Sequence, residues 1–385
     1  MRWVRDKSKV AIASTLVISV LLAVLGVFVM TDVGQLLAID KAIVVGYFKS
    51  HMVFMASSVL LFAVAVYLNR SHKLLRSWLM AGAGVFLVVC FVSTKYAAPY
   101  MLFRSQQHNS VYKTIAQAED YLEPDDVVYV VARNGVVRGF PQKYIWQPHI
   151  FGGDYGGESI ILTYCVLTNL PVAYSNDLDG QPMNLKVLAQ TNNNLLLWDT
   201  TSGEIIQQIT NTCEFSKREL EPLPVIQTNW KSFKELFPEG YILYNQFDTP
   251  VERALEFFAP LQDAHSGDKW MFNTVNTDDQ RLGSKEQIIG VKDSGEAVAY
   301  TRDFLREAKV INTRVGKKLF AIAHIPEHDM FVAFDRMKDG LTIEVTEVDV
   351  FGNTKAHGQL ERVFIYNGVL WAVWAHYHPE TRLMK

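Results

Sequence analysis

The chain has 385 residues, of which 49% are hydrophobic and 20% charged, and its formal net charge at pH 7 is −3. This balance lacks the excess of Lys and Arg that marks nucleic-acid-binding proteins, so nucleic acid is not expected as a partner. The length allows one large or two medium domains with a full hydrophobic core. The hydrophobic excess is concentrated near the N-terminus, which therefore predicts a different structure from the remainder.

Three apolar runs near the N-terminus predict transmembrane helices, and they cover residues 10–30, 52–68 and 77–94. About 20 apolar residues cross the hydrocarbon core of a bilayer as a helix, which satisfies its own backbone hydrogen bonds. Two alternatives stay open: the first run as a signal peptide, or two crossings instead of three. Residues 34–48 are apolar but interrupted by Asp40 and Lys41, so they predict an interfacial segment or a short outer helix.

The positions of Lys and Arg predict the orientation of this membrane anchor, residues 1–100. Basic segments stay on the cytoplasmic side of a membrane. Such residues precede the first run and fill the loop between the second and third: Arg2, Arg5, Lys7, Lys9, Arg70, Lys73 and Arg76. We therefore expect a multi-pass protein of the inner (cytoplasmic) membrane, with a cytoplasmic N-terminus and an extracytoplasmic C-terminal domain. The lipid bilayer is the expected partner of the anchor.

The rest of the chain contains an internal repeat. A shift of 160 positions aligns residues 126–141 with 286–301 without a gap and pairs Gly135 with Gly295. A long unbroken shift with matching glycines and apolar positions is hard to obtain by chance. We therefore predict two related halves and a segment between them that holds a connecting helix (249–261) and a linker. The predicted boundaries are residues 105–245 for the first half, 246–283 for the connecting segment and 284–385 for the second half.

Within each half the pattern of apolar residues is rich in predicted strands. Residues 126–141 predict a hairpin with Asn134-Gly135 as its turn. Residues 158–166 and 318–325 predict buried strands, and residues 111–124 predict an amphipathic helix. A short helix near Trp230 or Trp371 closes each half. The expected fold class is α+β: three transmembrane helices followed by an internally duplicated, mainly antiparallel, β-rich extracytoplasmic domain.

Three segments carry a resemblance to a known family. "GGESIILTYCVLTNLPVAY", "NNNLLLWDTTSGEIIQQIT" and "TNWKSFKELFP" resemble the bacterial and archaeal proteins catalogued as domain of unknown function 3179 (DUF3179). The resemblance covers most of residues 126–243 and continues more weakly through the second half. The family label carries no established reaction, so the resemblance implies a fold more than a function.

The chain departs from the pattern of that family at three places. The family runs T-Y/F-C-P-L-C, whereas here Cys165 is kept and the following proline and second cysteine are replaced by Val166 and Thr168. Of the family's H-E-x-x-N-D, only the two ends match, as His149 and Asp154. The family's Q-x-T/S-G is partly kept, as residues 208–211. A site that needs the full pattern would be altered in this chain.

Cys165 is the first candidate for chemistry, and three interpretations of it stay open. With His149 and Asp154 it is a candidate catalytic arrangement of thiol, imidazole and acid. It is also a candidate disulfide partner of Cys213, because two cysteines lie in the outer domain and an outer compartment is oxidising. The third interpretation is a buried small residue at a strand end, since its counterpart in the repeat is Ile325.

Imidazole and thiolate ligands suit copper or zinc, and the candidate metal ligands are His149, Cys165, His376 and His378. His376 and His378 share one face only in an extended backbone. Alignment with residues 230–238 favours a helix there, on which the two side chains diverge.

The expected function is that of a membrane-anchored binding module for an unknown small ligand or envelope protein, facing the periplasm or the cell exterior. Aromatic residues between the two halves are candidates for lining a ligand groove, since ligand pockets favour such junctions. The alternative is a metal- or thiol-dependent redox enzyme of the cell envelope that uses His149 and Cys165.

Overall fold

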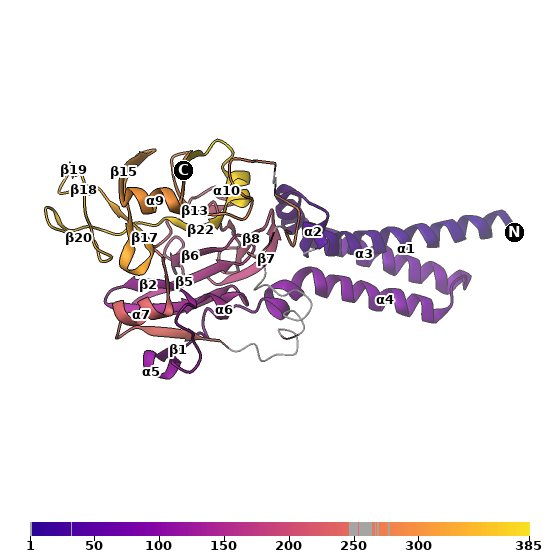
Figure 1. Cartoon of the computed structure of the whole chain (residues 1–385). Coiled ribbons are helices and arrows are strands. Elements are labelled where there is room, and N and C mark those ends of the chain that lie inside the picture. Colours follow the sequence, from indigo (N-terminus) through magenta and orange to yellow (C-terminus); the bar gives the residue numbers. More distant parts are fainter. Residues whose placement is uncertain are drawn as a thin grey trace. The chain divides into compact units, whose positions relative to one another are not determined.

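A computed structural model describes residues 2–31, 33–245, 253, 264–265, 267, 269–275 and 278–385 (Figure 1). Its contacts divide the chain into two compact units. The first unit contains the chain up to Arg104 together with residues 188–192 and 272–274, and the second contains the remainder. The predicted connecting helix, residues 249–261, lies outside the described residues except for Arg253, so it stays a prediction.

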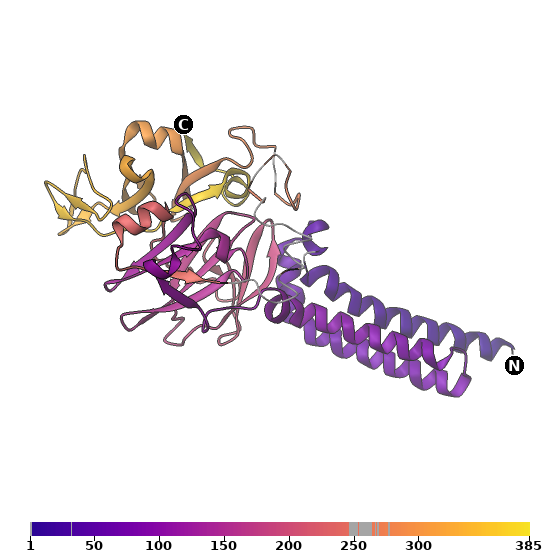
Figure 2. The same ribbon diagram turned by 60° about the horizontal axis from the view of Figure 1, so that its bottom comes forward.

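The first unit is built on three long apolar helices, which run side by side in Figure 2. They are α1 (Arg2–Met30), α3 (Lys41–His72) and α4 (Ser77–Val92), and α4 continues into the π-helix η1 (Ser93–Leu102). The stretches Lys7–Met30, Lys41–His72 and Ser77–Leu102 are each long and apolar enough to cross a membrane. The three predicted apolar helices are therefore confirmed, each covering the run that predicted it.

The prediction for residues 34–48 is wrong in part. Only the short helix α2 (Val33–Leu36) stands apart, because α3 already begins at Lys41. Asp40 is the N-cap of α3, and its side chain accepts a hydrogen bond from Ala42 N. Aspartate at this position satisfies one of the backbone N–H groups that a helix start leaves unpaired. The charged pair thus begins the second long helix and does not interrupt an apolar segment.

The second unit contains two equivalent sheets, one from each half. The strands of the first are β1 (Val111–Thr114), β2 (Val127–Arg133), β3 (Val136–Pro141), β11 (Ile226–Asn229) and β12 (Tyr241–Tyr244), in the order β1-β12-β3-β2-β11. The strands of the second are β13 (Gln287–Asp293), β14 (Glu296–Thr301), β22 (Tyr366–Leu370) and β23 (Arg382–Met384), in the order β22-β13-β14-β23. In both, the hairpin strands pair antiparallel and the last strand joins in parallel.

Each half also contains a three-stranded antiparallel sheet. The strands are β4 (Ile150–Tyr155), β5 (Glu158–Cys165) and β6 (Leu170–Ser175) in the first half, and β15 (Val310–Val315), β16 (Lys318–Ile325) and β17 (Met330–Asp335) in the second. The bounds of all six strands follow the offset of 160 positions that the sequence shows. The predicted internal duplication is confirmed, and the result is a propeller-like set of small antiparallel sheets.

The two halves differ in the elements that come after these sheets. The first half adds a four-stranded sheet of β7 (Leu185–Thr191), β8 (Asn194–Asp199), β9 (Ile205–Gln207) and β10 (Thr212–Cys213). The second half has only two small hairpins, β18 (Met337–Lys338) with β19 (Leu341–Thr342) and β20 (Asn353–Thr354) with β21 (Gly358–Gln359). The helix that closes each half begins at a fully buried tryptophan, in α7 (Trp230–Leu236) and α10 (Trp371–Tyr377).

The prediction of an amphipathic helix over residues 111–124 is wrong. Its first four residues form β1, and only α5 (Ile115–Ala118) is helical. Val111 to Thr114 are β-branched, aromatic or long side chains that fit the edge of a sheet, and they pair with β12. Thr114 then caps the short helix through a capping box with Gln117.

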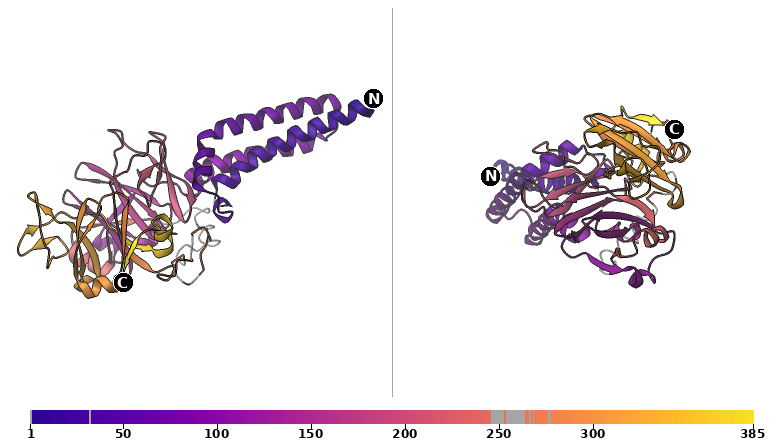
Figure 3. Two further views of the ribbon diagram at one scale, coloured as in Figure 1. Left: turned by 90° about the horizontal axis from the view of Figure 1, so that it is seen from above. Right: turned by 90° about the vertical axis from the view of Figure 1, so that its left-hand side faces the viewer.

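The two halves share one hydrophobic core. Val128, Ile226 and Trp230 of the first half pack in the same cluster as Ala323 and Val332 of the second. Figure 3 shows the strands of the second half, coloured orange to yellow, beside those of the first. Because this core crosses the boundary between them, we use the word seam for the contact surface between the halves.

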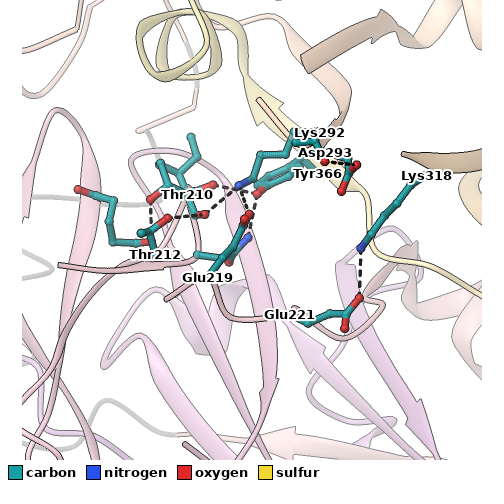
Figure 4. Close-up of polar contacts among 12 residues, drawn as sticks. Thr210, Thr212, Glu219, Glu221, Lys292, Asp293, Lys318 and Tyr366 are labelled. Atoms are coloured by element: carbon teal, nitrogen blue, oxygen red, sulfur yellow. Dashed lines mark hydrogen bonds and ion pairs between the residues drawn. The ribbon is translucent and has the colours of Figure 1, made fainter. Parts of the chain in front are cut away.

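Polar contacts also cross the seam, as Figure 4 shows. Lys292 Nζ of β13 donates to Thr210 O at 2.8 Å and lies 2.9 Å from Glu219 Oε1. Lys318 of β16 pairs with Glu221 at 3.1 Å. The segment after β10 is thereby tied to the second half at two points.

Candidate functional site

Cys165 lies at the end of β5 and is 1% exposed. Its Sγ accepts a hydrogen bond from Thr168 Oγ1 at 3.3 Å and donates to Asn193 O at 3.6 Å. Burial raises the pKa of the Cys165 thiol, so the neutral thiol is favoured. Cys165 and Cys213 are both free thiols, so the structure does not contain the disulfide that the sequence left open.

The surroundings of Cys165 form a buried hydrogen-bond network of neutral side chains. Asn194 Nδ2 donates both to Thr168 Oγ1 and to Gln208 Oε1, each at 3.1 Å. Gln208 Nε2 in turn donates to Thr163 Oγ1 at 2.9 Å. Such networks fix one arrangement of a core because each polar group needs its partner away from water. The geometry therefore agrees with the structural interpretation of Cys165.

His149 and Asp154 do not join Cys165 in one arrangement. His149 is 1% exposed, and its carbonyl accepts a hydrogen bond from Tyr164 N across the sheet. Burial lowers the pKa of the His149 imidazole to about 4. Asp154 is exposed at the far end of β4, where its carboxylate accepts from Gly157 N. Five residues of extended chain separate it from His149 by roughly 16 Å, so the candidate catalytic set is not assembled.

The other candidate metal ligands also lie apart. His376 is inside the helix α10 and His378 is its C-cap, as the repeat alignment indicated. The His378 ring packs on Trp374 with ring centroids 4.3 Å apart, and burial lowers the pKa of His378 to about 4. Within the described ranges, no three His, Cys, Asp or Glu side chains are grouped closely enough to hold a metal ion.

A different group of residues surrounds a pocket of about 140 Å³ at the seam. The first half contributes Gln227, Thr228 and Asn229 of β11, and the second half contributes Arg302, His328, Asp329, Phe331 and Asn367. Most of these side chains carry hydrogen-bonding groups. The volume is far above the roughly 10–15 Å³ that one water needs and below that of drug-sized sites. The pocket therefore suits a small polar ligand.

Arg302 is the main charge in this pocket. It is the first residue of helix α9 (Arg302–Ala308) and is held there by the N-cap Thr301, whose hydroxyl accepts from Phe304 N. Arg302 Nη2 donates to Gln227 Oε1 at 3.0 Å and to Asn367 Oδ1 at 3.4 Å. Both acceptors are neutral amides, and burial lowers the pKa of the guanidinium. The positive charge is thus oriented by the protein without being neutralised by these contacts.

The carboxylate in the pocket wall is already paired. Asp329 accepts hydrogen bonds from Arg306 Nε at 3.1 Å and Nη2 at 2.9 Å, and it lies 2.8 Å from His324 Nε2. The Arg306 guanidinium is the largest cause that holds the pKa of the Asp329 carboxyl below its usual range. The hydrogen bonds of Asp329 thus go to Arg306, but its negative charge also acts on Arg302, where it partly offsets the lowering of the guanidinium pKa by burial.

The duplication supplies a second copy of this arrangement with different residues. By the offset of 160 positions, Arg302, His324 and Asp329 of the second half correspond to Gln142, Tyr164 and Asn169 of the first. Asp329 and Asn169 both have left-handed backbones, with φ values of 46° and 56°. The first-half set is closed: Asn169 Oδ1 accepts from Gln142 Nε2, Tyr164 Oη and Tyr129 Oη, each at 2.9 Å. Only the second-half set borders the pocket.

Asn169 also ties the closed set to the pocket wall. Its Nδ2 donates to Gly368 O at 2.8 Å, across the seam. Gly368 has a φ of 84°, and a side chain there would approach Gln227 Oε1 and Arg302 Nη2 within 3.4 Å. A glycine is therefore required both by the backbone and by the space beside Arg302.

A second hollow of about 470 Å³ adjoins the first, since His328 lines both. Its other wall residues include Glu327, Glu347, Asp349 and Lys355. The short helix η3 (Pro326–His328) therefore lies between the two hollows.

Sequence reasoning missed Arg302, His328 and Asn367. For Arg302 the signal was present in the repeat, because the neutral Gln142 of the first half is replaced by this charged residue in the second; the repeat gives no such signal for His328 or Asn367. The matching glycines and apolar positions of the repeat report on the fold. Polar positions that differ between the halves indicate where a candidate binding site lies.

The comparisons with known proteins agree with the resemblance seen in the sequence. The model of a family described as protein of unknown function (DUF3179) matches residues 107–381, well over half of the chain. The chain therefore belongs to that family. No curated protein and no solved structure shows a significant match.

Proposed function

We propose that this DUF3179 protein is a membrane-anchored module that binds a small polar ligand at the seam between its two halves. The observation that carries the proposal is the pocket around Arg302, which takes wall residues from both halves. Ligand sites favour such junctions and combine a concave surface with a few convergent polar groups. The shared core of the halves supports the pocket walls on packed elements.

A variant that fills the pocket tests this proposal. His328 is half-buried and lines the pocket, so His328→Trp should fill it without disturbing the core. Neighbouring Glu327 is exposed and lines only the larger hollow, which makes Glu327→Trp a control of equal bulk. Binding of a panel of small neutral, anionic and cationic compounds to the purified full chain is measured by ligand-observed NMR. At least one compound should bind wild type and Glu327→Trp and lose its binding in His328→Trp; equal binding by all three would contradict the proposal.

We further propose that the domain faces the periplasm or the cell exterior. The arrangement of basic residues before α1 and between α3 and α4 supports a cytoplasmic N-terminus. Three crossings then place the chain after Arg104 on the other side. An alkaline phosphatase fused after residue 105 should be active, because that enzyme needs an extracytoplasmic location. An inactive phosphatase, with an active cytoplasmic reporter at the same position, would reverse the orientation.

The redox alternative has less support from the geometry. A thiol-dependent enzyme needs an accessible thiolate, whereas the Cys165 thiol is enclosed and its pKa is raised by burial. His149 lies directly before β4 and its carbonyl accepts a hydrogen bond from Tyr164 N, whereas the Cys165 thiol at the end of β5 donates to Asn193 O. The seam pocket therefore takes precedence over these residues as the proposed site.

A further inference from the structure

We propose that the ligand of the seam pocket is a small monocarboxylate, whose carboxylate group pairs with Arg302. This inference rests on the proposed function, because it names the chemical class that the same pocket would select. Its basis is the charge of the pocket wall, the burial of the groups beside that charge and the comparison between the two halves.

The charge of the wall favours one negative charge in the ligand. Arg302 Nη2 contacts only amide oxygens, from Gln227 and Asn367. Arg302 Nε is buried and has no hydrogen-bond partner within the described part of the chain. A largely buried cation whose own hydrogen bonds go to neutral amides is costly, and an anion at hydrogen-bond distance offsets that cost more fully than the charge of Asp329, which is shared with Arg306. Guanidinium groups recognise carboxylates through two parallel hydrogen bonds.

Buried polar groups around Arg302 supply further hydrogen-bonding capacity. Asn367 is 3% exposed, and its amide is oriented by a hydrogen bond from Nδ2 to Phe331 O at 3.3 Å. Thr228 is 7% exposed, and its Oγ1 has no hydrogen-bond partner among the described residues. A hydroxyl of this kind can donate to a carboxylate oxygen once a ligand displaces the contacts that now cover it. The orphaned hydroxyl is thus a second feature that points to a ligand.

Two further wall residues and the volume of the pocket limit the charge and the size of the ligand. The Phe331 ring lies beside the guanidinium, 5.3 Å from the Arg302 Cζ to the ring centroid. Asp329, although paired with Arg306, still carries a negative charge in the wall and disfavours a dianion. A volume of about 140 Å³ leaves room for a few carbon atoms beyond the carboxylate. Together these features favour one carboxylate with a small apolar part.

The equivalent position in the first half has a neutral side chain and does not line the seam pocket. There, position 142 is a glutamine in place of the arginine, and its amide donates to Asn169 and to both tyrosine hydroxyls. That network is closed by the protein's own groups. In the second half the corresponding residue, Arg302, bonds only to amide oxygens among the described residues and borders the pocket. The two halves therefore differ in charge at the position where an anion would bind.

The test measures the affinity of three probes for the full chain in detergent by ligand-observed NMR. The probes are sodium acetate, the neutral isostere acetamide, and inorganic phosphate. Acetate should bind at least about tenfold more tightly than acetamide, since a charge-assisted hydrogen bond contributes that much or more. Arg302→Gln should weaken acetate binding by at least about tenfold, and Arg302→Lys should weaken it less, because lysine keeps the charge but loses the paired hydrogen bonds.

Arg314→Gln is the matched control, because Arg314 is exposed on β15 and its Nε donates only to Gly316 O among the contacts described. Thermal unfolding of each variant checks that it is folded. Acetamide binding as tight as acetate would overturn the inference and leave the proposed function standing, and tighter binding of phosphate would replace the carboxylate with a phosphate group. Acetate binding that survives Arg302→Gln, or no binding of any probe, would also overturn the inference. The pocket-filling variant His328→Trp decides on the proposed function separately.

Discussion

Arg302 and Gln142 occupy equivalent positions of the two halves but differ in charge and in their contacts. Both begin the helix that follows the hairpin of their half, in α9 and in α6 (Gln142–Ile145). Gln142 is neutral and makes three hydrogen bonds, so it closes its surroundings. Arg302 brings a charge to the equivalent place, and the amides of Gln227 and Asn367 orient it beside the pocket. The exchange of glutamine for arginine is thus one of three side-chain differences that separate a closed network from a candidate site.

The contacts of Cys165 agree with a structural interpretation of this residue. Cys165 is notable because it breaks the symmetry with Ile325, and both residues end equivalent strands. The sequence could show that the position tolerates an apolar residue. It could not show the contact of the thiol with Asn193, because Asn193 lies 28 positions away, between β7 and β8, and its approach depends on the tertiary structure. Long-range hydrogen bonds of this kind are set by tertiary structure alone.

His149 predicts a dependence of stability on pH. Burial lowers its pKa from 6.5 to about 4, so the folded state prefers the neutral imidazole. Its contribution to stability is therefore fully present above pH 6.5 and is lost as the pH falls towards 4, where the unfolded state binds the proton more readily. For one fully buried group the loss reaches about 3 kcal/mol. Chemical denaturation of the full chain between pH 7 and pH 4 measures it.

His149→Asn should make this profile less steep, since asparagine accepts the positive φ of 74° at this position and does not titrate. The part that remains is expected from His378, whose pKa burial also lowers to about 4. His108→Asn is the control, because His108 is exposed and its replacement should leave the profile unchanged. A profile that is equally steep in wild type and in His149→Asn would show that other groups cause the loss of stability in acid.

The elements with strong local signals are predicted well from the sequence. Asn134-Gly135 and Ser294-Gly295 turn the two hairpins, and all four residues have positive φ values as such turns require. The repeat relates the hairpin and the three-stranded sheet of one half to those of the other, which a single segment could not do. The failures are residues 34–48 and 111–124, where a capping aspartate resembles a helix break and an edge strand resembles a helix. Pairing with the distant β12 decides the second case, and no local pattern reports on it.

The contacts that join the halves make a prediction about the seam. Lys292 is 17% exposed and its Nζ has two partners, Thr210 O and Glu219 (Figure 4). Lys292→Ala should lower the free energy of unfolding by about 1–3 kcal/mol, as expected for a hydrogen bond that involves a charged group. Lys318 pairs with Glu221 in an exposed setting, so Lys318→Ala should cost no more than about 0.5 kcal/mol.

Chemical denaturation at neutral pH compares the two lysine variants with wild type. Both substitutions remove a positive charge and a contact with a glutamate across the seam. The difference between the two losses of stability therefore measures the effect of the greater burial of Lys292 and of its second partner, Thr210 O. Equal losses of stability would mean that the seam gains nothing from the partly buried contact.

At the scale of the whole molecule, three apolar helices precede a duplicated domain whose two halves share a core. Composition is enough to predict the three apolar helices, because a bilayer crossing requires a certain length and hydropathy of a helix. The pocket could not be predicted in this way, since Arg302 lies 75 positions from Gln227 and 65 from Asn367, its partners in the pocket wall. The two halves have the same fold but differ at equivalent polar positions. In the first half these residues bond to one another, and in the second half they border a pocket at the seam.

The most direct test of the seam pocket as a ligand site is a crystal structure of the full chain soaked with sodium acetate. The carboxylate is predicted to lie in the pocket, within hydrogen-bond distance of the Arg302 guanidinium and beside Asn367 and Thr228. Acetate bound elsewhere with an empty seam pocket, in crystals whose lattice leaves that pocket open, would contradict the assignment of the site.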